Sequence, residues 1–178
     1  MKKNGILKEV LNTSIYILFV LLVTMLIVKF VCQKTEVVGD SMESTLSDGD
    51  NLIIEKISYE LGEPERFDVI VFPSEKEKIY LIKRIIGLPG EKVYIDSDGN
   101  IYIDDELLDE HYGLETIENP GNAAFPILLG EDEYFVLGDN RNNSLDSRFG
   151  DVGNVKKDKI LGRAWWQIWP LNDIHGIK

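Results

Sequence analysis

The sequence predicts a mainly β domain that follows a single N-terminal transmembrane helix. Two observations predict this arrangement. A long uncharged stretch lies near the N-terminus, and short apolar runs behind it alternate with turn-forming residues. With 178 residues, the chain is long enough to bury one sizeable core, because domains of roughly 100 to 200 residues are the usual unit.

The N-terminal stretch is long and apolar enough for a membrane anchor. Val10–Val28 contains 19 consecutive uncharged residues, close to the ~20 that a helix needs to cross a bilayer. Lys29 follows at once, and a lysine at a helix end extends its amine to the membrane surface. We therefore predict a transmembrane helix over about residues 13–32, with residues 1–12 as a cytoplasmic N-terminus.

A cleaved secretory signal is the alternative for this stretch, since Lys2, Lys3 and Lys8 precede it. The segment Lys29–Lys34 contains no small-x-small cleavage site, which favours an uncleaved anchor. Three lysines lie before the apolar stretch and two lie after it, and positive charge favours the cytoplasmic side. We therefore expect a single-pass protein of the cell membrane, with residues 35–178 outside the cytoplasm.

Charge and cysteine content exclude several classes of protein. Residues 1–34 carry five lysines and one glutamate, a net charge of +4, and the rest carries 14 basic and 30 acidic residues, a net charge of −16. A domain this acidic repels phosphate backbones, so nucleic-acid binding is not expected. Cys32 is the only cysteine, which excludes an intrachain disulfide and a thiolate metal cage. We interpret Cys32 as a residue of the apolar helix.

Short runs rich in Val, Ile, Tyr and Phe predict strands in the domain. These runs are Thr35–Val38, Asn51–Ile57, Phe67–Phe72, Tyr80–Ile86, Val93–Ile95, Ile101–Ile103 and Tyr134–Leu137.

Two of the runs flank Asp96–Asn100, whose Asp-Gly-Asn sequence tolerates positive φ and predicts a hairpin loop. The loop also resembles the start of a calcium site, but Ile101 stands where such a loop requires glycine. The hairpin is therefore the preferred interpretation. Residues 104–133 are polar, with scattered Gly and Pro, and we predict a polar insertion at about 91–133.

Three segments combine turn-forming residues with a reactive or charged group beside a predicted strand. They are Val38–Leu46, Tyr80–Gly90 and Gly138–Gly150. Taken singly, each has an ordinary structural explanation. Ser41 could be a turn hydroxyl, Lys83 a solvated strand end, and the third segment a polar loop with a structural ion pair.

Lys83 is the most informative of these residues. Lys83 and Arg84 are adjacent in an apolar run, so one of them must point toward the apolar side. Burial would lower the pKa of a lysine amine from ~10.4 toward the range in which the neutral amine accepts a proton. Arginine stays charged and cannot act as a base. A serine with a neutral lysine is a protease arrangement that needs no histidine.

The two histidines offer a weaker alternative. His111 lies in the polar insertion and His175 near the C-terminus, and neither has the turn-and-strand setting of a catalytic base. We expect both at the surface. A Ser-His-Asp triad stays open as an alternative, because triad residues assemble in space rather than in sequence.

Together, the three segments resemble the conserved boxes of bacterial type I signal peptidases, in the short single-anchor form of Gram-positive bacteria. In that family the boxes read S-M-x-P-T-L, K-R-x-x-G-x-P-G-D and G-D-N-R-x-x-S-x-D-S-R. Residues 41–46 match the first box except at Ser44, and Lys83–Glu91 matches the second except at its last residue. Gly138–Arg148 matches the third at every fixed position. The resemblance implies a signal-peptidase-type catalytic domain that is β-barrel-like.

The resemblance also implies roles for single residues. Ser41 resembles the nucleophile and Lys83 its general base, and Met42 resembles the residue that lines the site. Ser144 resembles the hydroxyl that hydrogen-bonds the lysine amine. Some relatives place a second oxyanion donor, a serine hydroxyl, where this chain has Gly39.

The resemblance also assigns an ion pair to the third segment, and the chain departs from the family pattern at two further positions. Asp146 and Arg148 resemble a structural ion pair that holds the loop. Ser44 replaces a proline, which should loosen the turn after the nucleophile. Phe67 replaces the glycine that usually precedes the Asp-Ile-Val-Val-Phe strand.

The implied function is that of a membrane-bound serine endopeptidase that removes N-terminal signal peptides from exported preproteins after small-x-small sites, through an acyl-enzyme. No metal and no organic cofactor are implied. The implied partners are secreted preproteins, the lipid bilayer and, transiently, the export machinery. The alternatives are an inactive membrane-tethered homologue that acts in binding or assembly, and a self-cleaving repressor of related Ser-Lys fold. The predicted anchor argues against the repressor.

Overall fold

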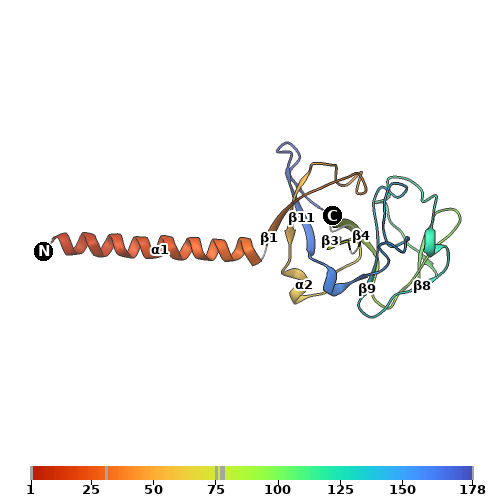
Figure 1. The fold of residues 1–178 in the computed structure, drawn as a ribbon, viewed down its shortest axis with the longest axis horizontal. Helices are drawn as coiled ribbons and strands as arrows, with labels where there is room; N and C mark the ends of the chain where they lie inside the picture. Colours follow the sequence, from red (N-terminus) through yellow and green to blue (C-terminus); the bar gives the residue numbers. More distant parts are fainter. Residues whose placement is uncertain (1, 31, 75, 77–78, 178) are drawn as a thin grey trace.

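The computed structural model describes residues 2–30, 32–74, 76 and 79–177. The chain begins with the helix α1 (Lys2–Phe30), which extends away from a β domain and carries the N-terminus at its far end (Figure 1). The C-terminus lies on the β domain (Figure 1).

Helix α1 has the length and hydropathy of a membrane span. Its 29 residues correspond to about 43 Å at the usual helical rise, more than the ~30 Å hydrocarbon core of a bilayer. The window Lys8–Met25 has a mean hydropathy of 1.5, and none of it is buried against the rest of the protein. The helix therefore fits a membrane anchor.

The helix is longer than the predicted membrane span, and one predicted assignment at this end was wrong. The helix begins at Lys2, ahead of the span predicted at about residues 13–32, because a helix continues through polar helix-forming residues as readily as through apolar ones. Cys32 is the first residue of strand β1 (Cys32–Glu36) rather than part of the helix. It pairs with Glu55 in an antiparallel ladder, and this pairing is a long-range contact that composition does not report.

An eight-stranded antiparallel sheet forms the body of the β domain. Its strands follow the order β1-β2-β11-β3-β4-β9-β10, and β12 pairs with β11. Besides β1, they are β2 (Asn51–Glu55), β3 (Val69–Pro73), β4 (Tyr80–Gly87), β9 (Glu133–Leu137), β10 (Val155–Lys156), β11 (Gly162–Trp169) and β12 (His175–Gly176). Strand β4 therefore lies inside the sheet, between β3 and β9.

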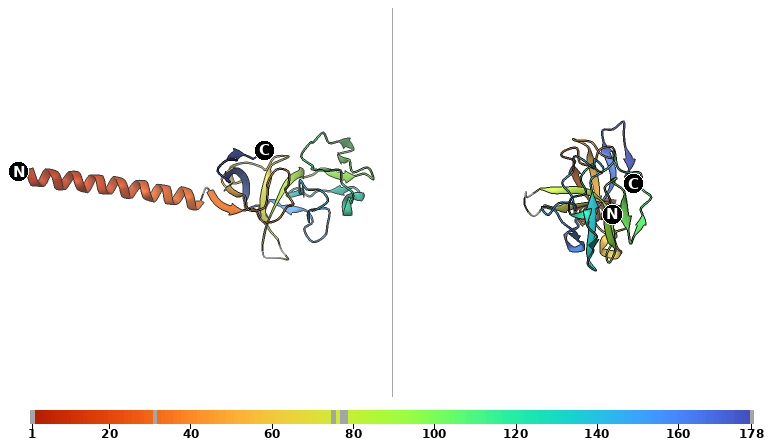
Figure 2. Two further views of the ribbon diagram at one scale, coloured as in Figure 1. Left: turned by 90° about the horizontal axis from the view of Figure 1, so that it is seen from above. Right: turned by 90° about the vertical axis from the view of Figure 1, so that its right-hand side faces the viewer.

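The predicted insertion forms a second, smaller sheet. Its order is β7-β6-β5-β8, with β5 (Lys92–Ile95), β6 (Ile101–Ile103), β7 (Glu106–Leu107) and β8 (Ile127–Leu128). This sheet lies at the end of the β domain away from α1 (Figures 1 and 2). Three short helices connect strands: α2 (Ser58–Leu61), η1 (Gly121–Ala124) and η2 (Lys157–Lys159).

The predicted hairpin is confirmed. Strands β5 and β6 pair antiparallel, with Tyr94 opposite Tyr102. Gly99 has a φ of 82°, which explains the glycine in this loop. The Asp96 carboxylate accepts the backbone N–H groups of Asp98 and Asn100, each at 2.9 Å. Both bonds go to Oδ1 of Asp96, which therefore closes the loop.

The prediction of a mainly β domain behind one N-terminal helix is confirmed, and each of the seven predicted runs overlaps a strand. Strand β11 is not among those runs. Its pairing with β2 contains two register shifts, between Ala164 and Trp166 and between Gln167 and Trp169. Such irregularities interrupt the alternation of buried and exposed residues that identifies a strand in a sequence.

The core covers both faces of β4. Ile85 packs in a cluster with Ile70 and Val136, whereas its neighbour Ile86 packs in another with Phe135. Successive strand residues point to opposite faces, so neither face of β4 is open to water at this point. Ile85 and Ile86 have no exposed surface.

A substitution at the end of β4 tests how tightly the two sheets pack. A Cβ at Gly87 would lie 2.5 Å from Cγ2 of Val93 and 3.1 Å from Cβ of Phe135. We expect Gly87→Ala to lower the free energy of unfolding by about 1–3 kcal/mol, the usual cost of overpacking. Denaturant unfolding of the whole chain in detergent measures this change.

Gly150→Ala is the matched control, because no atom lies within 4 Å of a Cβ at Gly150. It should change the free energy of unfolding by less than about 0.5 kcal/mol. Equal losses in the two variants would contradict the packing described for Gly87.

Candidate active site

Ser41 and Lys83 meet in space although they lie 42 positions apart in the sequence. Ser41 lies in the turn that follows β1, and Lys83 lies within β4. Nζ of Lys83 donates hydrogen bonds to Oγ of Ser41 at 2.7 Å and to the carbonyl oxygen of Ile82 at 2.9 Å. The lysine amine is therefore aimed at the serine hydroxyl.

The amine of Lys83 is removed from water. The side chain is 2% exposed, and this burial lowers the pKa of Lys83 to about 8, although the negative charges of Asp146 and Asp139 act in the opposite direction. The neutral amine is therefore well populated at mildly alkaline pH.

The same shift links the lysine to stability. Because the pKa of Lys83 is lower in the folded protein, the unfolded chain binds this proton more tightly. Burial of the amine therefore destabilises the fold below about pH 8, and this effect fades as the pH rises toward the ordinary lysine pKa of 10.5.

The turn that carries Ser41 is held from two sides. The backbone N–H of Asn140 donates to the Ser41 carbonyl oxygen, and Nδ2 of Asn140 donates to the Asp40 carbonyl oxygen, both at 3.1 Å. On the other side, Met42 is 1% exposed and packs in a core cluster with Leu46. The nucleophile turn is therefore fixed between the third segment and the core.

Two departures from the family lie in or beside this turn. Gly39 has a φ of 88°, a left-handed conformation that favours glycine, and its N–H donates to Oδ1 of Asp48 at 2.7 Å. This conformation accounts for glycine at position 39. Ser44 is exposed, and the peptide bond between Glu43 and Ser44 is cis.

Arg84 and Asp139 form a buried ion pair to which the sequence analysis assigned no role. Nε of Arg84 donates to Oδ1 of Asp139 at 2.9 Å and Nη2 donates to Oδ2 at 2.7 Å, and both side chains are fully buried. Thr45, in the nucleophile turn, donates its hydroxyl to Oδ2 at 2.5 Å. The pair thus joins β4, the third segment and the turn of Ser41. Opposite charges at fixed positions of two family boxes were the signal for it in the sequence.

The predicted pair of Asp146 and Arg148 is present. Nε of Arg148 donates to Oδ1 of Asp146 at 2.8 Å, and the two side chains are 1% and 0% exposed. Oδ2 of Asp146 also accepts the N–H of Gly138 at 3.1 Å. These bonds tie the two ends of the third segment together.

The predicted hydrogen bond from Ser144 to Lys83 is wrong. Oγ of Ser144 is buried and has no hydrogen-bond partner among the described residues, while the Lys83 amine bonds Ser41 and Ile82. The Ser144 side chain instead packs against Gly138, where a Cβ would lie 2.3 Å from Oγ of Ser144. The Ser144 side chain therefore occupies the space that the missing Gly138 side chain leaves.

A cleft of about 270 Å³ opens beside the Ser41–Lys83 pair. Its walls come from residues 36–38 at and after the end of β1, from Met42, and from residues 79–83 at the start of β4. Along this wall, β4 pairs with β3 from Tyr80 onward, whereas its ladder with β9 begins at Arg84. Within the described ladders, the β4 edge beside the cleft is therefore unpaired.

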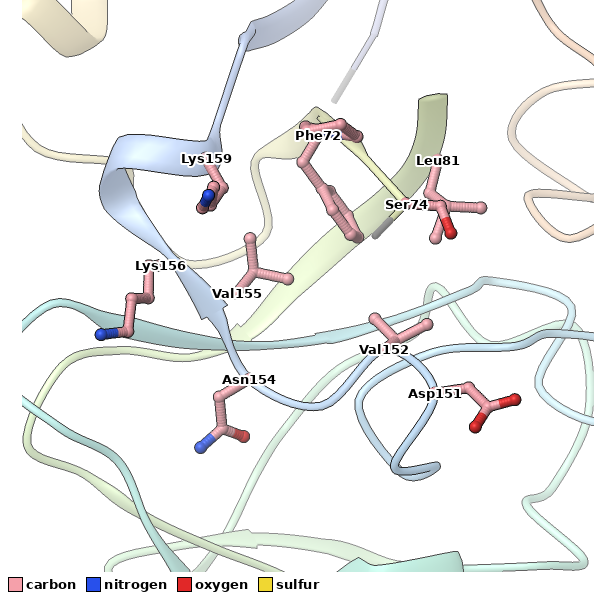
Figure 3. A pocket seen from close by; sticks show the side chains of 10 residues that line it. Phe72, Ser74, Leu81, Asp151, Val152, Asn154, Val155, Lys156 and Lys159 are labelled. Atoms are coloured by element: carbon pink, nitrogen blue, oxygen red, sulfur yellow. The ribbon is translucent and has the colours of Figure 1, made fainter. Parts of the chain in front are cut away.

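A smaller hollow of about 150 Å³ lies elsewhere and does not include Ser41 or Lys83 (Figure 3). Phe72, Leu81 and Val155 line it, and all three belong to or pack against one core cluster. We interpret it as a shallow gap at the edge of that core.

The histidines lie at the surface, as predicted. The side chain of His111 is 90% exposed and that of His175 is 43% exposed. Neither lines the cleft beside Ser41. Within the part of the chain that the structure describes, no group of three or more His, Cys, Asp or Glu residues is placed to hold a metal ion.

A buried lysine amine hydrogen-bonded to a serine hydroxyl, in the lining of a cleft in a β domain, defines a candidate hydrolase of the Ser-Lys type. Residues 10–169 match the model of a family described as "Signal peptidase, peptidase S26". The chain therefore belongs to the signal peptidase family, whose members are serine endopeptidases that remove signal peptides.

Several known proteins are similar to this chain. A probable signal peptidase I-2 from Synechocystis sp. is 45% identical over 148 residues, which cover 80% of this chain and 65% of that protein. Signal peptidase I T of Bacillus subtilis is 34% identical over 169 residues, which cover 91% of this chain and 86% of that protein. A crystal structure of a signal peptidase I from Enterococcus faecalis V583 is 36% identical, with a TM-score of 0.47, and covers 57% of this chain and 96% of that chain.

The Arg84–Asp139 pair provides a test of the site's construction. Arg84→Met leaves the Asp139 carboxylate buried without its main cation, and such a loss costs about 3–5 kcal/mol of the free energy of unfolding. Denaturant unfolding measures this loss.

Lys92→Met is the control, because Lys92 pairs with Asp105 at 2.5 Å on the surface, with side chains 35% and 79% exposed. Exposed pairs contribute about 0–1 kcal/mol. A loss in Arg84→Met as small as in Lys92→Met would show that Asp139 finds another partner.

Proposed function

We propose that this chain is a working signal peptidase in which Ser41 is the nucleophile and Lys83 is the general base. The observation that carries the proposal is the 2.7 Å hydrogen bond between Nζ of Lys83 and Oγ of Ser41, made by an amine whose burial lowers its pKa to about 8. The neutral amine accepts the Ser41 proton as Oγ attacks the scissile carbonyl carbon.

The remaining steps follow from the same two groups. The protonated Lys83 gives its proton to the leaving amine as the peptide bond breaks, which leaves an acyl-enzyme on Ser41. Lys83 then takes a proton from a water molecule, which attacks the acyl carbon. As the ester bond breaks and the carboxyl end of the signal peptide leaves, Lys83 returns this proton to Oγ of Ser41. The Ser41 N–H is one proposed oxyanion donor, a kind of group that typically contributes about 10²- to 10³-fold in rate.

The cleft supports a peptide substrate in an extended conformation. An unpaired strand edge binds an extended peptide through main-chain hydrogen bonds, and Tyr80–Lys83 offers such an edge beside Ser41. The cleft volume of about 270 Å³ suits small side chains on the peptide. Cleavage of exported preproteins after small-x-small sites fits this shape.

The anchor supports a location at the membrane. We propose that α1 spans the cell membrane with the N-terminus in the cytoplasm, so that residues 35–178 act on the outer side. Residues 1–12 would be cytoplasmic, and about 13–30 would cross the bilayer. Confining enzyme and signal peptide to one surface raises their effective concentration. Transient contact with the export machinery belongs to the same proposal.

Substitution of the two residues tests the proposed chemistry. Ser41→Ala removes the nucleophile and Lys83→Met removes the base while keeping the side-chain length, so each should lower preprotein cleavage at least 10³-fold. The assay uses the full chain in detergent or vesicles with a radiolabelled preprotein, and circular dichroism verifies that each variant is folded.

Ser44→Ala is the matched control for the nucleophile, because it deletes an exposed hydroxyl three residues from Ser41. It should keep cleavage within a few-fold of the unsubstituted protein. Cleavage that survives in folded Ser41→Ala would exclude Ser41 as the nucleophile. A folded, unsubstituted chain that does not cleave preproteins would instead favour a tethered homologue without catalysis.

The pH dependence tests the role of the lysine. Since the base must be neutral, kcat/KM should rise with pH through the Lys83 pKa of about 8 and level off above it. Measurement of preprotein cleavage from pH 6 to 10 gives this profile. A half-maximal rate near pH 6.5, the usual histidine pKa, would favour the Ser-His-Asp alternative.

A further inference from the structure

One aromatic ring of the insertion contacts Arg84, the residue that follows Lys83. Tyr112 precedes β8, in the segment between β7 and η1. Its ring lies over the guanidinium of Arg84, with 3.8 Å between Cζ of Arg84 and the ring centroid. This distance is well inside the ~6 Å range of cation–π attraction.

Phe67 supports the Tyr112 ring from the core. The two ring centroids are 5.0 Å apart, with the planes inclined by 39°. The Phe67 carbonyl oxygen also accepts a hydrogen bond from Nη1 of Arg84 at 2.9 Å. Phe67 thus contacts Arg84 through its backbone and Tyr112 through its ring.

The backbone of Phe67 is in a conformation that disfavours a bulky residue. Its φ is 73°, in the left-handed region where a side chain is strained and glycine is not. Glycine would adopt this backbone without strain, so this chain accepts a strained backbone and gains a ring against Tyr112. The ring contact offsets part of that strain.

Arg84 connects this aromatic contact to the proposed dyad. Its guanidinium neutralises Asp139 and donates to Thr45 in the Ser41 turn at 3.1 Å. Lys83, the preceding residue of β4, is surrounded by the charges of Asp139 and Asp146, which pair with Arg84 and Arg148 respectively. The Arg84–Asp139 pair therefore affects Ser41 through the bonds to Thr45, and it affects Lys83 through the charge of Asp139.

We propose that Tyr112, supported by Phe67, is a positioning residue for catalysis, because its ring shields the Arg84 guanidinium and keeps it directed at Asp139 and Thr45. This inference rests on the proposed function of Ser41 and Lys83. It assigns the insertion a part in the geometry of the site, although Tyr112 does not line the cleft.

Loss of the ring should change the protonation of Lys83. Without it, water reaches Arg84 and weakens its pairing with Asp139, so the carboxylate is less well neutralised. The same water reduces the desolvation of the nearby amine. Asp139 raises the pKa of Lys83 and burial lowers it, so both changes raise this pKa.

The test compares the pH profiles of Tyr112→Ala and Tyr112→Phe, using cleavage of a preprotein by the full chain in detergent. In Tyr112→Ala the rising limb of kcat/KM should move up by about 0.5 to 1 pH unit, which lowers kcat/KM about threefold to tenfold at pH 7 and leaves it nearly unchanged above the shifted limb. The loss should fall on kcat rather than KM. Tyr112→Phe keeps the ring and should keep the profile.

Tyr94→Ala is the matched control. Tyr94 also belongs to an aromatic pair in the insertion, with its centroid 5.9 Å from that of Tyr102, and its ring pairs there rather than with Arg84. It should leave the pH profile in place even if it lowers stability. Equal profiles in Tyr94→Ala and Tyr112→Ala would overturn the proposal.

A double-substitution cycle tests whether Phe67 acts through its contact with Tyr112 or only through general loosening of the core. Phe67→Gly removes the ring and the backbone strain together, so it should shift the profile in the same direction as Tyr112→Ala. Because the two rings act through one contact, the double variant should shift the profile less than the two single shifts added. Fully additive shifts would contradict support of Tyr112 by Phe67.

The experiments distinguish failure of the Tyr112 proposal from failure of the proposed Ser41–Lys83 dyad. If Ser41→Ala or Lys83→Met retained cleavage, the dyad itself would be wrong. If both abolished cleavage while Tyr112→Ala kept the unsubstituted pH profile, the dyad would stand and the positioning role of Tyr112 would be excluded.

Discussion

The proposed chemistry depends on taking the amine of Lys83 out of water. A lysine at the surface is protonated at neutral pH and cannot accept the proton of a serine. Strand β4 provides the burial because it lies between β3 and β9 and both of its faces are covered, as Ile85 and Ile86 show. A buried charge is costly without a partner, so Arg84, the next residue, needs Asp139. Burial within β4 thus makes the Lys83 amine available as a base and makes a buried counter-charge necessary for Arg84.

Most of the β domain could be predicted from local sequence because its strands are short apolar runs between turn residues. The hairpin at Asp96–Asn100 is the clearest case, since its loop chemistry and its flanking strands agree. Strand β11 could not be predicted in this way, because its register shifts against β2 interrupt the alternation. The start of α1 and the strand position of Cys32 depend on helix continuation and on pairing with Glu55, which hydropathy does not describe.

The candidate site was predictable as a set of residues and less so as a geometry. Alternation along the strand indicated that Lys83 or Arg84 must be buried, but the structure buries both, because β4 has no open face at that point. The meeting of Lys83 with Ser41 depends on how distant strands and the nucleophile turn pack, which spacing alone does not encode. Ser144 shows the same limit. Its hydroxyl packs against Gly138, whose lack of a side chain creates the space, rather than against the amine.

The positions of Gly39, Ser44 and Phe67 in the structure explain how each departure from the family pattern can affect the site. Gly39 and Ser44 flank the nucleophile in a turn whose backbone is held by Asn140 and whose Met42 side chain is buried, so changes there leave the position of Ser41 supported. Phe67 lies on the other side of Arg84, where a left-handed backbone would suit glycine. Its ring contacts Tyr112. Tyr112 lies in a polar segment without the apolar pattern that would have predicted this contact from the sequence. Besides backbone contacts such as the Leu114 N–H with the Asp139 carbonyl oxygen, the insertion therefore contacts the Arg84 guanidinium directly. In the proposal made above, a change in that contact affects the protonation of Lys83 by electrostatics, without any contact between Tyr112 and the substrate.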